Sequence, residues 1–274
     1  MLTHPATTDA GLLRCLDCGG AIEAPACPGC GRGYPESGGI VEAIGPLGGT
    51  NRIAADFYEG PGWARFRPWE RAFLIAQGGT RRARMQVLRH LPTLKTARVL
   101  EVGIGDGANL PYLPASWEVH GVDIARMQLE GCARRAPAMA GRLARAEAEA
   151  LPYDDDTFDA CWSVGGFNYF RDRTAALLEM RRVTRPGGRL IVADEVPGLF
   201  RFGIGHLLGR PGIDAAWLGM LGLPREFVAM VFRHDPDVDA DVRRAAPGAT
   251  RHRIWNRLGY CYVDTTPLAG EPRR

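Results

Sequence analysis

The sequence predicts an α/β protein with a doubly wound parallel sheet, preceded by a small metal-binding module. Three observations lead to this interpretation. Strand-like apolar runs alternate with helical runs from residue 97 onward, a glycine-rich turn follows the first of these strands, and two Cys-x-x-Cys pairs lie near the N-terminus. Strands that alternate with helices form parallel sheets that are covered by helices on both faces.

The composition is that of an ordinary globular protein, with 46% hydrophobic and 24% charged residues in a chain of 274. No apolar run approaches the roughly 20 residues needed to span a bilayer, and the first residues lack the features of a secretory signal. We therefore expect a soluble, cytoplasmic protein. The formal net charge of +3 is too small by itself to indicate a nucleic-acid partner, and the oligomeric state stays open.

The cysteine-rich stretch CLDCGGAIEAPACPGC predicts a structural zinc site. Its two Cys-x-x-Cys pairs are separated by eight residues, and each pair is short enough for a tight turn to aim two thiolates at one ion. Four cysteine ligands leave no open position for catalysis. Two disulfides are the alternative, which a cytoplasmic location disfavours. The expected ligands are Cys15, Cys18, Cys27 and Cys30.

The stretch GRGYPESGGI, which follows the cysteines, resembles the small zinc-ribbon subunit that activates tRNA and release-factor methyltransferases. A zinc ribbon also precedes the catalytic domain of an rRNA guanine methyltransferase family, whose ligand spacing matches less well. We therefore expect a tail at residues 1–10, a zinc ribbon at residues 11–44 and a linker at residues 45–51.

The remaining residues, 52–274, are expected to form one large domain. Helical pieces fill residues 51–92, with breaks at 60–62 and 78–79. Strands are predicted at residues 97–102, 117–123, 141–148, 158–164 and 187–195, and helices at residues 107–113, 127–136 and 171–184. Two further strand-like runs flank Leu258 and Gly259 near the C-terminus.

The turn after the first strand, VLEVGIGDGANLPYL, fits two nucleotide cofactors. Gly103, Gly105 and Ala108 match the GxGxxG/A pattern of dinucleotide-binding folds. The same residues, read as ExGxGxG, fit a loop that binds S-adenosylmethionine (SAM). Asp123 closes the second strand, where a carboxylate can accept hydrogen bonds from both hydroxyls of a ribose. Because both cofactors contain that ribose, these residues do not separate them.

Three later features resemble the ubiquinone- and menaquinone-type class I SAM methyltransferases. The stretch AEAEALPYDDDTFDACWSV resembles the segment that leads into the family's fourth strand, and RRVTRPGGRLIVAD resembles its entry to strand five. The two C-terminal runs suit the antiparallel hairpin of that family's sheet. A nicotinamide-binding domain requires none of these features, so we expect SAM as the cofactor and a seven-stranded, Rossmann-like methyltransferase sheet.

The resemblance implies which residues bind the cofactor. The glycines let the main chain approach the methionine part of SAM, Glu101 organises the loop and the cofactor amino group, and Asp123 binds the ribose hydroxyls. The implied set is Tyr58, Glu101, Gly103, Gly105, Gly107, Asp123, Ile124, Glu147, Ala148 and Ser163.

The other members of this set have more local roles. Glu147, at a position where the family more often has aspartate, is expected to contact the adenine amine, with Ile124 and Ala148 beside the base. Ser163 is expected near the amino-acid end of the cofactor. Tyr58 corresponds to an aromatic residue that covers the cofactor carboxylate, although it could equally pack on the core.

An unusually long insertion at about residues 197–248 separates strands five and six, and we expect it to form a helical lid. The insertion and the helices before the first strand are where this family builds its acceptor pocket. Both are rich in aromatic residues and methionine, which favours an apolar or aromatic small-molecule acceptor. The stretch SVGGFNYF lacks the Asn/Asp-Pro-Pro-aromatic motif of nucleic-acid and protein amine methyltransferases, and Phe167 and Tyr169 would line the acceptor side instead.

Methyl transfer is a direct displacement, so positioning alone can carry much of the barrier. A general base helps where the acceptor must lose a proton. Candidates near the ends of strands four and five include Asp194 and Glu195. The lid adds two histidines, His206 and His234, of which His206 lies closer to the end of strand five. The residues selected as catalytic candidates are Asn168, Tyr169 and His206.

Two other functions remain open from the sequence. An RNA-modifying methyltransferase could use the ribbon for docking, but residues 11–44 contain two arginines against four acidic residues, which makes a nucleic-acid partner unlikely. A non-catalytic SAM-binding protein could use the ribbon to contact a partner. The identity of the acceptor and its reacting atom, O, N, C or S, are not determined.

Overall fold

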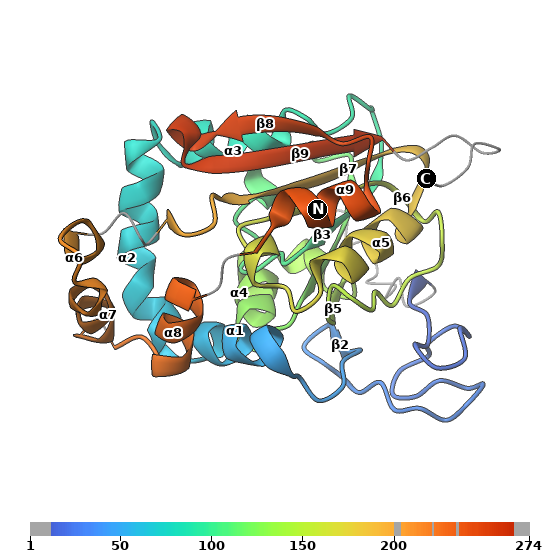
Figure 1. The fold of residues 1–274 in the computed structure, drawn as a ribbon. Helices are drawn as coiled ribbons and strands as arrows, with labels where there is room; N and C mark the ends of the chain where they lie inside the picture. Colours follow the sequence, from blue (N-terminus) through green and yellow to red (C-terminus); the bar gives the residue numbers. More distant parts are fainter. Residues whose placement is uncertain (1–11, 200–203, 221, 234–235, 266–274) are drawn as a thin grey trace.

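A nine-stranded mixed sheet forms the centre of the molecule, with helices on both faces (Figure 1). The computed structural model describes residues 12–199, 204–220, 222–233 and 236–265. Within them the strand order is β1-β2-β5-β4-β3-β6-β7-β9-β8. The strands are β1 (Glu36–Ser37), β2 (Ile40–Glu42), β3 (Arg98–Val102), β4 (Glu118–Asp123), β5 (Leu143–Arg145), β6 (Phe158–Val164), β7 (Thr184–Glu195), β8 (Thr250–Ile254) and β9 (Gly259–Thr265).

Seven of these strands confirm the expected doubly wound sheet. Strands β5, β4, β3, β6 and β7 are parallel, and β9 runs antiparallel between β7 and β8. The chain reverses its direction of winding at β3, which pairs with β4 on one side and with β6 on the other. Ligands bind outside the carboxyl ends of the strands at such a switch point.

The other two strands belong to the cysteine-rich segment, and this was not predicted. Strand β2 pairs in parallel with β5, with Ile40 opposite Leu143, and β1 pairs antiparallel with β2. Leu13 forms a further bridge to Tyr153. The expected ribbon therefore extends the sheet at one edge, at the lower right in Figure 1.

Most of the helices cover the two faces of the sheet, and the others form a group at one end of the molecule (Figure 1). The helices are α1 (Gly49–Glu59), α2 (Pro61–Ala76), α3 (Thr80–Leu88), α4 (Arg126–Arg135), α5 (Arg173–Val183), α6 (Ile204–Leu207), α7 (Pro211–Met220), α8 (Arg225–Arg233) and α9 (Val238–Ala245). The first three are separated at Gly60 and at Gly78 and Gly79, as predicted. Helix α1 begins at Gly49, inside the expected linker.

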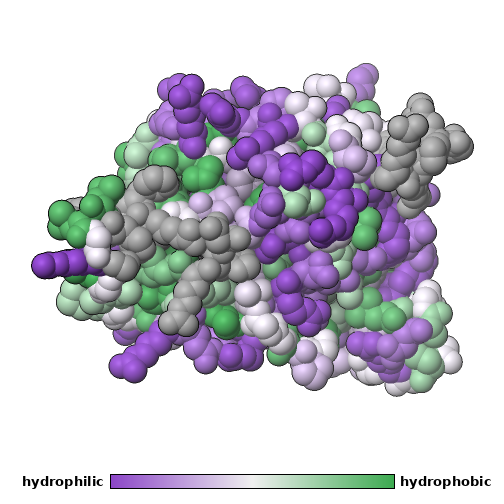
Figure 2. All heavy atoms as spheres, in the orientation of Figure 1, coloured by the Kyte–Doolittle hydropathy of each residue, from purple (hydrophilic) through white to green (hydrophobic). Residues whose placement is uncertain are grey.

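The expected lid divides into two parts. Helices α6, α7 and α8 lie together at the left of Figure 1, and α8 packs on α1 through the rings of Phe57 and Phe227, whose centroids are 3.7 Å apart. Helix α9 instead buries Val238 and Val242 in the core beside α5, so it belongs to the layer that covers the sheet. Figure 2 shows hydrophobic residues gathered around α6–α8.

The helix expected at residues 107–113 is replaced by a single short turn. Only a 3₁₀ segment, Leu110–Tyr112, forms there. Pro111 lacks a backbone N–H, and Pro114 comes directly after the expected helix, so a longer helix would lose hydrogen bonds. Other short 3₁₀ segments lie at Pro137–Met139, Phe167–Tyr169 and Trp255–Arg257. Over the residues that the structure describes, no helix is long and apolar enough to cross a membrane.

Candidate cofactor and acceptor site

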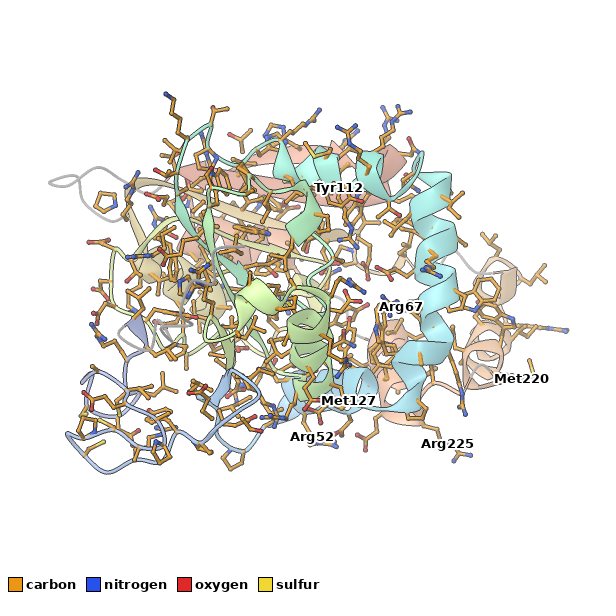
Figure 3. The ribbon with its side chains drawn as sticks, turned by 180° about the vertical axis from the view of Figure 1, so that it is seen from behind. Arg52, Arg67, Tyr112, Met127, Met220 and Arg225 are labelled. Atoms are coloured by element: carbon orange, nitrogen blue, oxygen red, sulfur yellow. The ribbon has the colours of Figure 1, made fainter. Side chains whose placement is uncertain are left out.

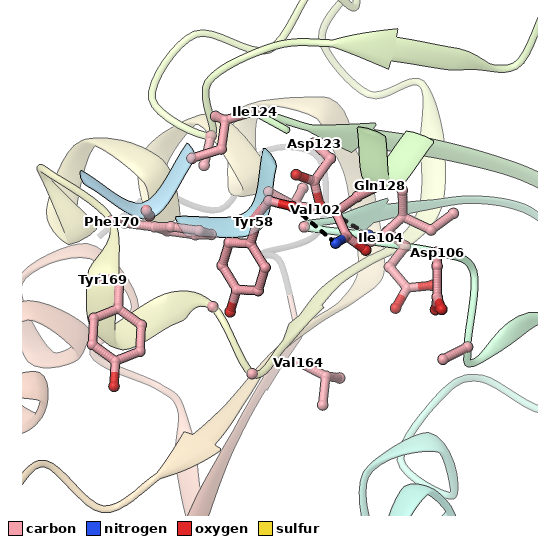
Figure 4. Close-up of a pocket in the computed structure, with 18 of the residues that line it drawn as sticks. Tyr58, Val102, Ile104, Asp106, Asp123, Ile124, Gln128, Val164, Tyr169 and Phe170 are labelled. Atoms are coloured by element: carbon pink, nitrogen blue, oxygen red, sulfur yellow. Dashed lines mark hydrogen bonds between the residues drawn. The ribbon is translucent and has the colours of Figure 1, made fainter. Parts of the chain in front are cut away.

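One large pocket opens at the carboxyl ends of β3, β4 and β6, under α1 and α2 (Figure 4). Its empty volume is about 1020 Å³, open solvent at the mouth included. Of the predicted site residues, those that line it are Tyr58, Glu101, Gly103, Gly105, Asp123, Ile124, Ala148 and Tyr169. The switch point of the sheet therefore brings together most of the predicted site.

The glycine turn forms the floor of the pocket, but its three glycines differ. Gly103 and Gly105 have φ angles of +75° and +56°, a left-handed backbone that favours glycine, and both line the pocket. Gly107 does not line it. A Cβ atom at Gly107 would lie 2.8 Å from both Cys132 Sγ and Leu110 Cδ1, so this glycine permits close packing of the turn against α4.

Asp123 is held in place at the end of β4. Its Oδ2 accepts a hydrogen bond from the backbone N–H of Gly105 at 2.9 Å (Figure 4), and its Oδ1 accepts one from the backbone N–H of Ala125 at 2.8 Å. Burial raises the pKa of Asp123 to about 6, although these backbone N–H groups oppose the shift. The pocket is thus lined by a carboxylate that is fixed to the glycine turn.

Glu101 lies deeper, with 1% of its surface exposed. Asn109 Nδ2 donates to its Oε1, whereas the buried Oε2 has no hydrogen-bond partner among the described residues. Burial raises the pKa of Glu101 to about 7, while the Asn109 hydrogen bond, the charge of Arg84 and the nearby indole N–H of Trp162 lower it. A buried carboxylate oxygen without a partner suits a ligand that brings an N–H donor or a positive charge. This donor set fits the amino group of SAM.

The side of the pocket expected to hold adenine is lined by Ile124 and Ala148, but not by Glu147. Glu147 Oε1 accepts a hydrogen bond from Asn51 Nδ2 at 2.8 Å, outside the pocket wall. Asn51 also donates to Glu149 Oε2 at 3.0 Å, and both Asn51 and Glu149 line the pocket. Of the two glutamates that Asn51 contacts, Glu149 therefore lines the pocket and Glu147 does not.

Aromatic rings form the opposite wall. Tyr58 and Trp63 pack with ring centroids 5.1 Å apart, and Tyr169 and Phe170 line the wall beside them. Phe167 was expected on this wall, but it is fully buried in the core and packs against Phe170. Of the residues in SVGGFNYF, Phe170 therefore takes that place.

Tyr169 is the one catalytic candidate whose described side chain reaches the pocket. Its hydroxyl donates to Glu195 Oε1 at 3.1 Å, and burial beside Glu195 raises its pKa well above the ordinary value. Tyr169 therefore links the pocket to a carboxylate at the end of β7.

Asn168, another catalytic candidate, does not line this pocket; it lines a small separate cavity beside Tyr169 and Glu195. Its Nδ2 donates to the backbone carbonyl of Glu195 at 2.8 Å, and its Oδ1 accepts from the Tyr260 hydroxyl at 2.7 Å. Its backbone N–H donates to Asp194, which is fully buried. The amide is thus committed to holding η4 (Phe167–Tyr169) against β7 and β9.

The remaining predicted residues are Ser163 and the two histidines of the lid. Ser163 is fully buried in β6 behind the glycine turn, with its Oγ 3.8 Å from where a Cβ of Gly103 would stand. The side chain of His206 lies outside the described part of the structure, as does the whole of His234.

Several pocket residues were not predicted, because they come from elements far apart in the sequence. Arg84 of α3 donates to Asn109 Oδ1 at 2.8 Å and lies 3.8 Å from Glu70 of α2. Arg67 of α2, labelled in the rear view (Figure 3), lies outside this pocket, but its Nη2 is 2.6 Å from Oδ2 of Asp106, which lines it. Asp106 and Asn109 do lie within the glycine-rich stretch, so their positions next to the motif could have indicated them.

The four N-terminal cysteines converge on one point. Their sulfur atoms all lie within 4.8 Å of one another, and the pairs Cys15–Cys30 and Cys18–Cys27 are 3.4 and 3.5 Å apart. Sulfurs around a tetrahedral zinc ion at about 2.3 Å would be about 3.8 Å apart. The geometry suits a metal ion with four thiolate ligands, and none of the seven cysteines forms a disulfide.

Comparisons with known proteins agree with this site. Residues 100–192, which include the glycine turn and Asp123, match the family model of a methyltransferase domain. The demethylmenaquinone methyltransferase of Deinococcus radiodurans is 32% identical over 195 residues, which cover 65% of this chain and 77% of that protein. The chain belongs to the class I SAM-dependent methyltransferases.

Other relatives match shorter stretches of this methyltransferase. Methyltransferase GfsG of Streptomyces halstedii is 37% identical over 134 residues, which cover 44% of this chain and 46% of that protein. This methyltransferase spans about half the length of most of the curated relatives that it matches. A solved phosphoethanolamine N-methyltransferase 2 of Haemonchus contortus is 14% identical with a TM-score of 0.50, covering 86% of this chain and 62% of that one, and it shares the fold.

Proposed function

We propose that this protein transfers the methyl group of SAM to an apolar or aromatic small-molecule acceptor. The observation that carries the proposal is the pocket itself. One side presents two carboxylates, Glu101 and Asp123, at a glycine turn, and the other side presents aromatic rings. Family membership supplies the cofactor, and the aromatic wall supports the class of acceptor.

In this proposal the chain's own residues position the cofactor. The Asp123 carboxylate binds the ribose hydroxyls, the free Oε2 of Glu101 accepts from the amino group, and Ile124 and Ala148 flank the base. Bound SAM supplies an electrophilic methyl carbon on a sulfonium. Because the pocket already fixes both carboxylates, little reorganisation is needed on binding, and positioning can lower the barrier by up to roughly 7 to 11 kcal/mol.

The aromatic wall holds the acceptor and excludes water. Tyr58, Trp63, Tyr169 and Phe170 supply ring faces for an apolar or aromatic compound. The names of the demethylmenaquinone methyltransferases among the relatives favour a quinone-like ring as this acceptor. Where the acceptor must lose a proton, that proton passes to Tyr169 Oη as the tyrosine proton passes to Glu195 Oε1, across the 3.1 Å hydrogen bond.

The cysteine cluster is proposed to hold one structural zinc ion. Cys15, Cys18, Cys27 and Cys30 leave no position for a substrate on the metal, so methyl transfer does not pass through it. We propose the cytoplasm as the compartment, where free thiols persist.

The experiment that tests this function uses methyl-labelled SAM. Binding of SAM to the purified chain is measured first, and transfer is then assayed in parallel against quinols, an extract of small molecules and total RNA. We expect label in an apolar aromatic product. Label in RNA alone would favour the RNA-modifying alternative, and SAM binding without transfer to any acceptor would favour a non-catalytic SAM-binding protein.

A further inference from the structure

We propose that Glu42, at the end of the cysteine-rich segment, is a positioning residue for the cofactor site. By this inference the ribbon does more than add stability, because it holds the Asp123–Ala125 bend in its binding conformation. The inference rests on the proposed function, since it takes that bend as part of the SAM site.

Glu42 is the last residue of β2, and its carboxylate contacts two arginines of the main domain. Its Oε1 accepts from Arg126 Nη1, and its Oε2 lies 3.5 Å from Arg145 Nη1. Arg126 is the first residue of α4, directly after the Asp123–Ala125 bend, and it also donates to the backbone carbonyl of Ser37 at 3.1 Å. The ribbon is therefore attached to the start of the helix that follows the bend.

The two arginines continue these contacts to the bend itself. Arg145 Nε donates to the backbone carbonyl of Ile124 at 2.8 Å. Glu59 Oε1 accepts both from the backbone N–H of Arg126 at 2.8 Å and from Arg145 Nη2 at 3.0 Å. Glu59 directly follows Tyr58 of the aromatic wall. Two glutamates and two arginines thus enclose the bend from the ribbon, α1, α4 and β5.

The backbone forms a second connection along the same path. Strand β2 pairs with β5, and the N–H of Ala43 donates to the carbonyl of Arg145 at 2.9 Å. The next residue of the main domain, Ala146, lines the pocket and donates its N–H to the carbonyl of Asp123 at 3.1 Å. Backbone hydrogen bonds therefore join the ribbon to β5, and β5 in turn to the bend.

The four charged side chains are mostly shielded from water. Their exposed fractions are 19% for Glu42, 34% for Glu59, 26% for Arg126 and 22% for Arg145. Ion pairs at this level of burial are screened less than surface pairs. Without the charge of Glu42, the Arg145 guanidinium keeps Glu59 as its partner and loses its side-chain connection to the ribbon, while the backbone pairing of β2 with β5 remains. A more mobile bend must then be ordered when SAM binds, which lowers affinity.

The test compares SAM binding by calorimetry in the full chain, in Glu42→Gln and in Asp154→Asn. The control removes a different ribbon contact, the 2.7 Å ion pair of Arg14 with Asp154, which lies away from the pocket lining. We expect Glu42→Gln to raise the Kd for SAM by roughly three- to tenfold, with the acceptor KM unchanged. Asp154→Asn should leave both values unchanged.

A Kd for Glu42→Gln within twofold of wild type would overturn the inference. Equal weakening of SAM binding in both variants would also overturn it, because any loosened ribbon contact would then have the same effect. If Glu42→Gln does not fold, Arg145→Lys is judged by the same criteria, since a lysine cannot contact Glu42, Glu59 and Ile124 together. Failure of the wild-type chain to bind SAM would instead contradict the proposed function.

Discussion

At the scale of single residues, the site depends on two buried carboxylates whose pKa values are raised above the ordinary range. Asp123 and Glu101 both line the pocket, and burial raises their pKa values to about 6 and about 7. The amino group of a cationic cofactor would supply a partner for Glu101 Oε2, and ribose hydroxyls would add donors to Asp123, which already accepts from Gly105 and Ala125. Their burial therefore costs stability in the free protein and favours binding of such a ligand.

Replacing Asp123 by alanine tests the ribose contact. We expect Asp123→Ala to weaken SAM binding about 10- to 100-fold, because charge-assisted hydrogen bonds contribute roughly 1.5 to 3 kcal/mol each. Calorimetry gives the dissociation constant, and circular dichroism checks that the fold is intact. Since Asp123 also accepts from Gly105 and Ala125, Asp123→Asn serves as the matched variant that keeps an acceptor oxygen. An unchanged dissociation constant in Asp123→Ala would remove this residue from the site.

The raised pKa values also predict a pH dependence. Both carboxylates are protonated more readily in the folded chain than when exposed, so their ionisation lowers stability as pH rises through about 4 to 7. SAM binding has the opposite trend, because it requires the ionised carboxylates. We expect the Kd for SAM to fall between about pH 5.5 and 8, with protons released on binding.

Calorimetry in two buffers of different ionisation enthalpy measures this proton release. Glu101→Gln should remove the part of the pH dependence near pH 7 and leave the part near pH 6, which belongs to Asp123. An affinity for SAM that stays constant over this pH range would contradict the assignment of both carboxylates.

The residues whose positions were predicted wrongly show that a sequence motif does not determine the hydrogen-bond partners of a side chain. The motif around the adenine position placed Glu147 in the pocket, but Asn51 of α1 binds Glu147 and only Glu149 lines it. Similarly, Asn168 follows strand β6 as expected, yet the Tyr260 hydroxyl of β9 and the carbonyl of Glu195 occupy its amide. In both cases the deciding partner comes from an element distant in the chain.

At the scale of elements, the connection after β6 brings Tyr169 to the end of β7. The 3₁₀ turn Phe167–Tyr169 is fixed by hydrogen bonds from Asn168 to Asp194 and Glu195, which leaves the Tyr169 hydroxyl on Glu195 Oε1. This arrangement places the Glu195 carboxylate next to Tyr169 of the aromatic wall. No short sequence motif encodes it, because it depends on the neighbouring strands.

Tyr169→Phe tests this arrangement. The variant keeps the ring but removes the hydroxyl, so we expect SAM binding to remain within twofold and turnover to fall by about 10²-fold, for an acceptor that must lose a proton. Glu195→Gln should also lower turnover, since an amide is a weaker proton acceptor than a carboxylate. Steady-state kinetics at saturating SAM measure the effect, and an unchanged kcat in Tyr169→Phe would assign the tyrosine a packing role only.

At the scale of the whole molecule, the alternation of strands and helices predicted the doubly wound sheet and its switch point, and the family resemblance predicted its seven strands and the C-terminal hairpin. It did not predict that the cysteine-rich segment adds β1 and β2 to the edge at β5. Such a pairing leaves little trace in the sequence, because β2 contains only three residues, Ile40–Glu42. The short apolar pair Ile40–Val41 is a weak signal beside the strong cysteine pattern.

The ribbon and the main domain share one core, and this predicts how they unfold. Leu13, Ile22 and Tyr34 of the ribbon are buried in the same cluster as Leu151 and Tyr153 of the main domain. Structural zinc contributes on the order of 10 to 16 kcal/mol in small peptides. Removal of the metal should therefore lower the melting temperature of the whole chain in a single transition, and added zinc should restore it.

Scanning calorimetry of the chelated and zinc-reloaded protein measures this effect, with Cys18→Ser as a variant that lacks one ligand. Cys18 is exposed, so its replacement removes a sulfur ligand with little loss of packing. Because the ribbon core is continuous with the sheet, loss of the ligand should reach the cofactor site, and SAM should stabilise the reloaded protein more than the chelated one. Two separate transitions, with the larger one insensitive to chelation, would show instead that the ribbon unfolds on its own.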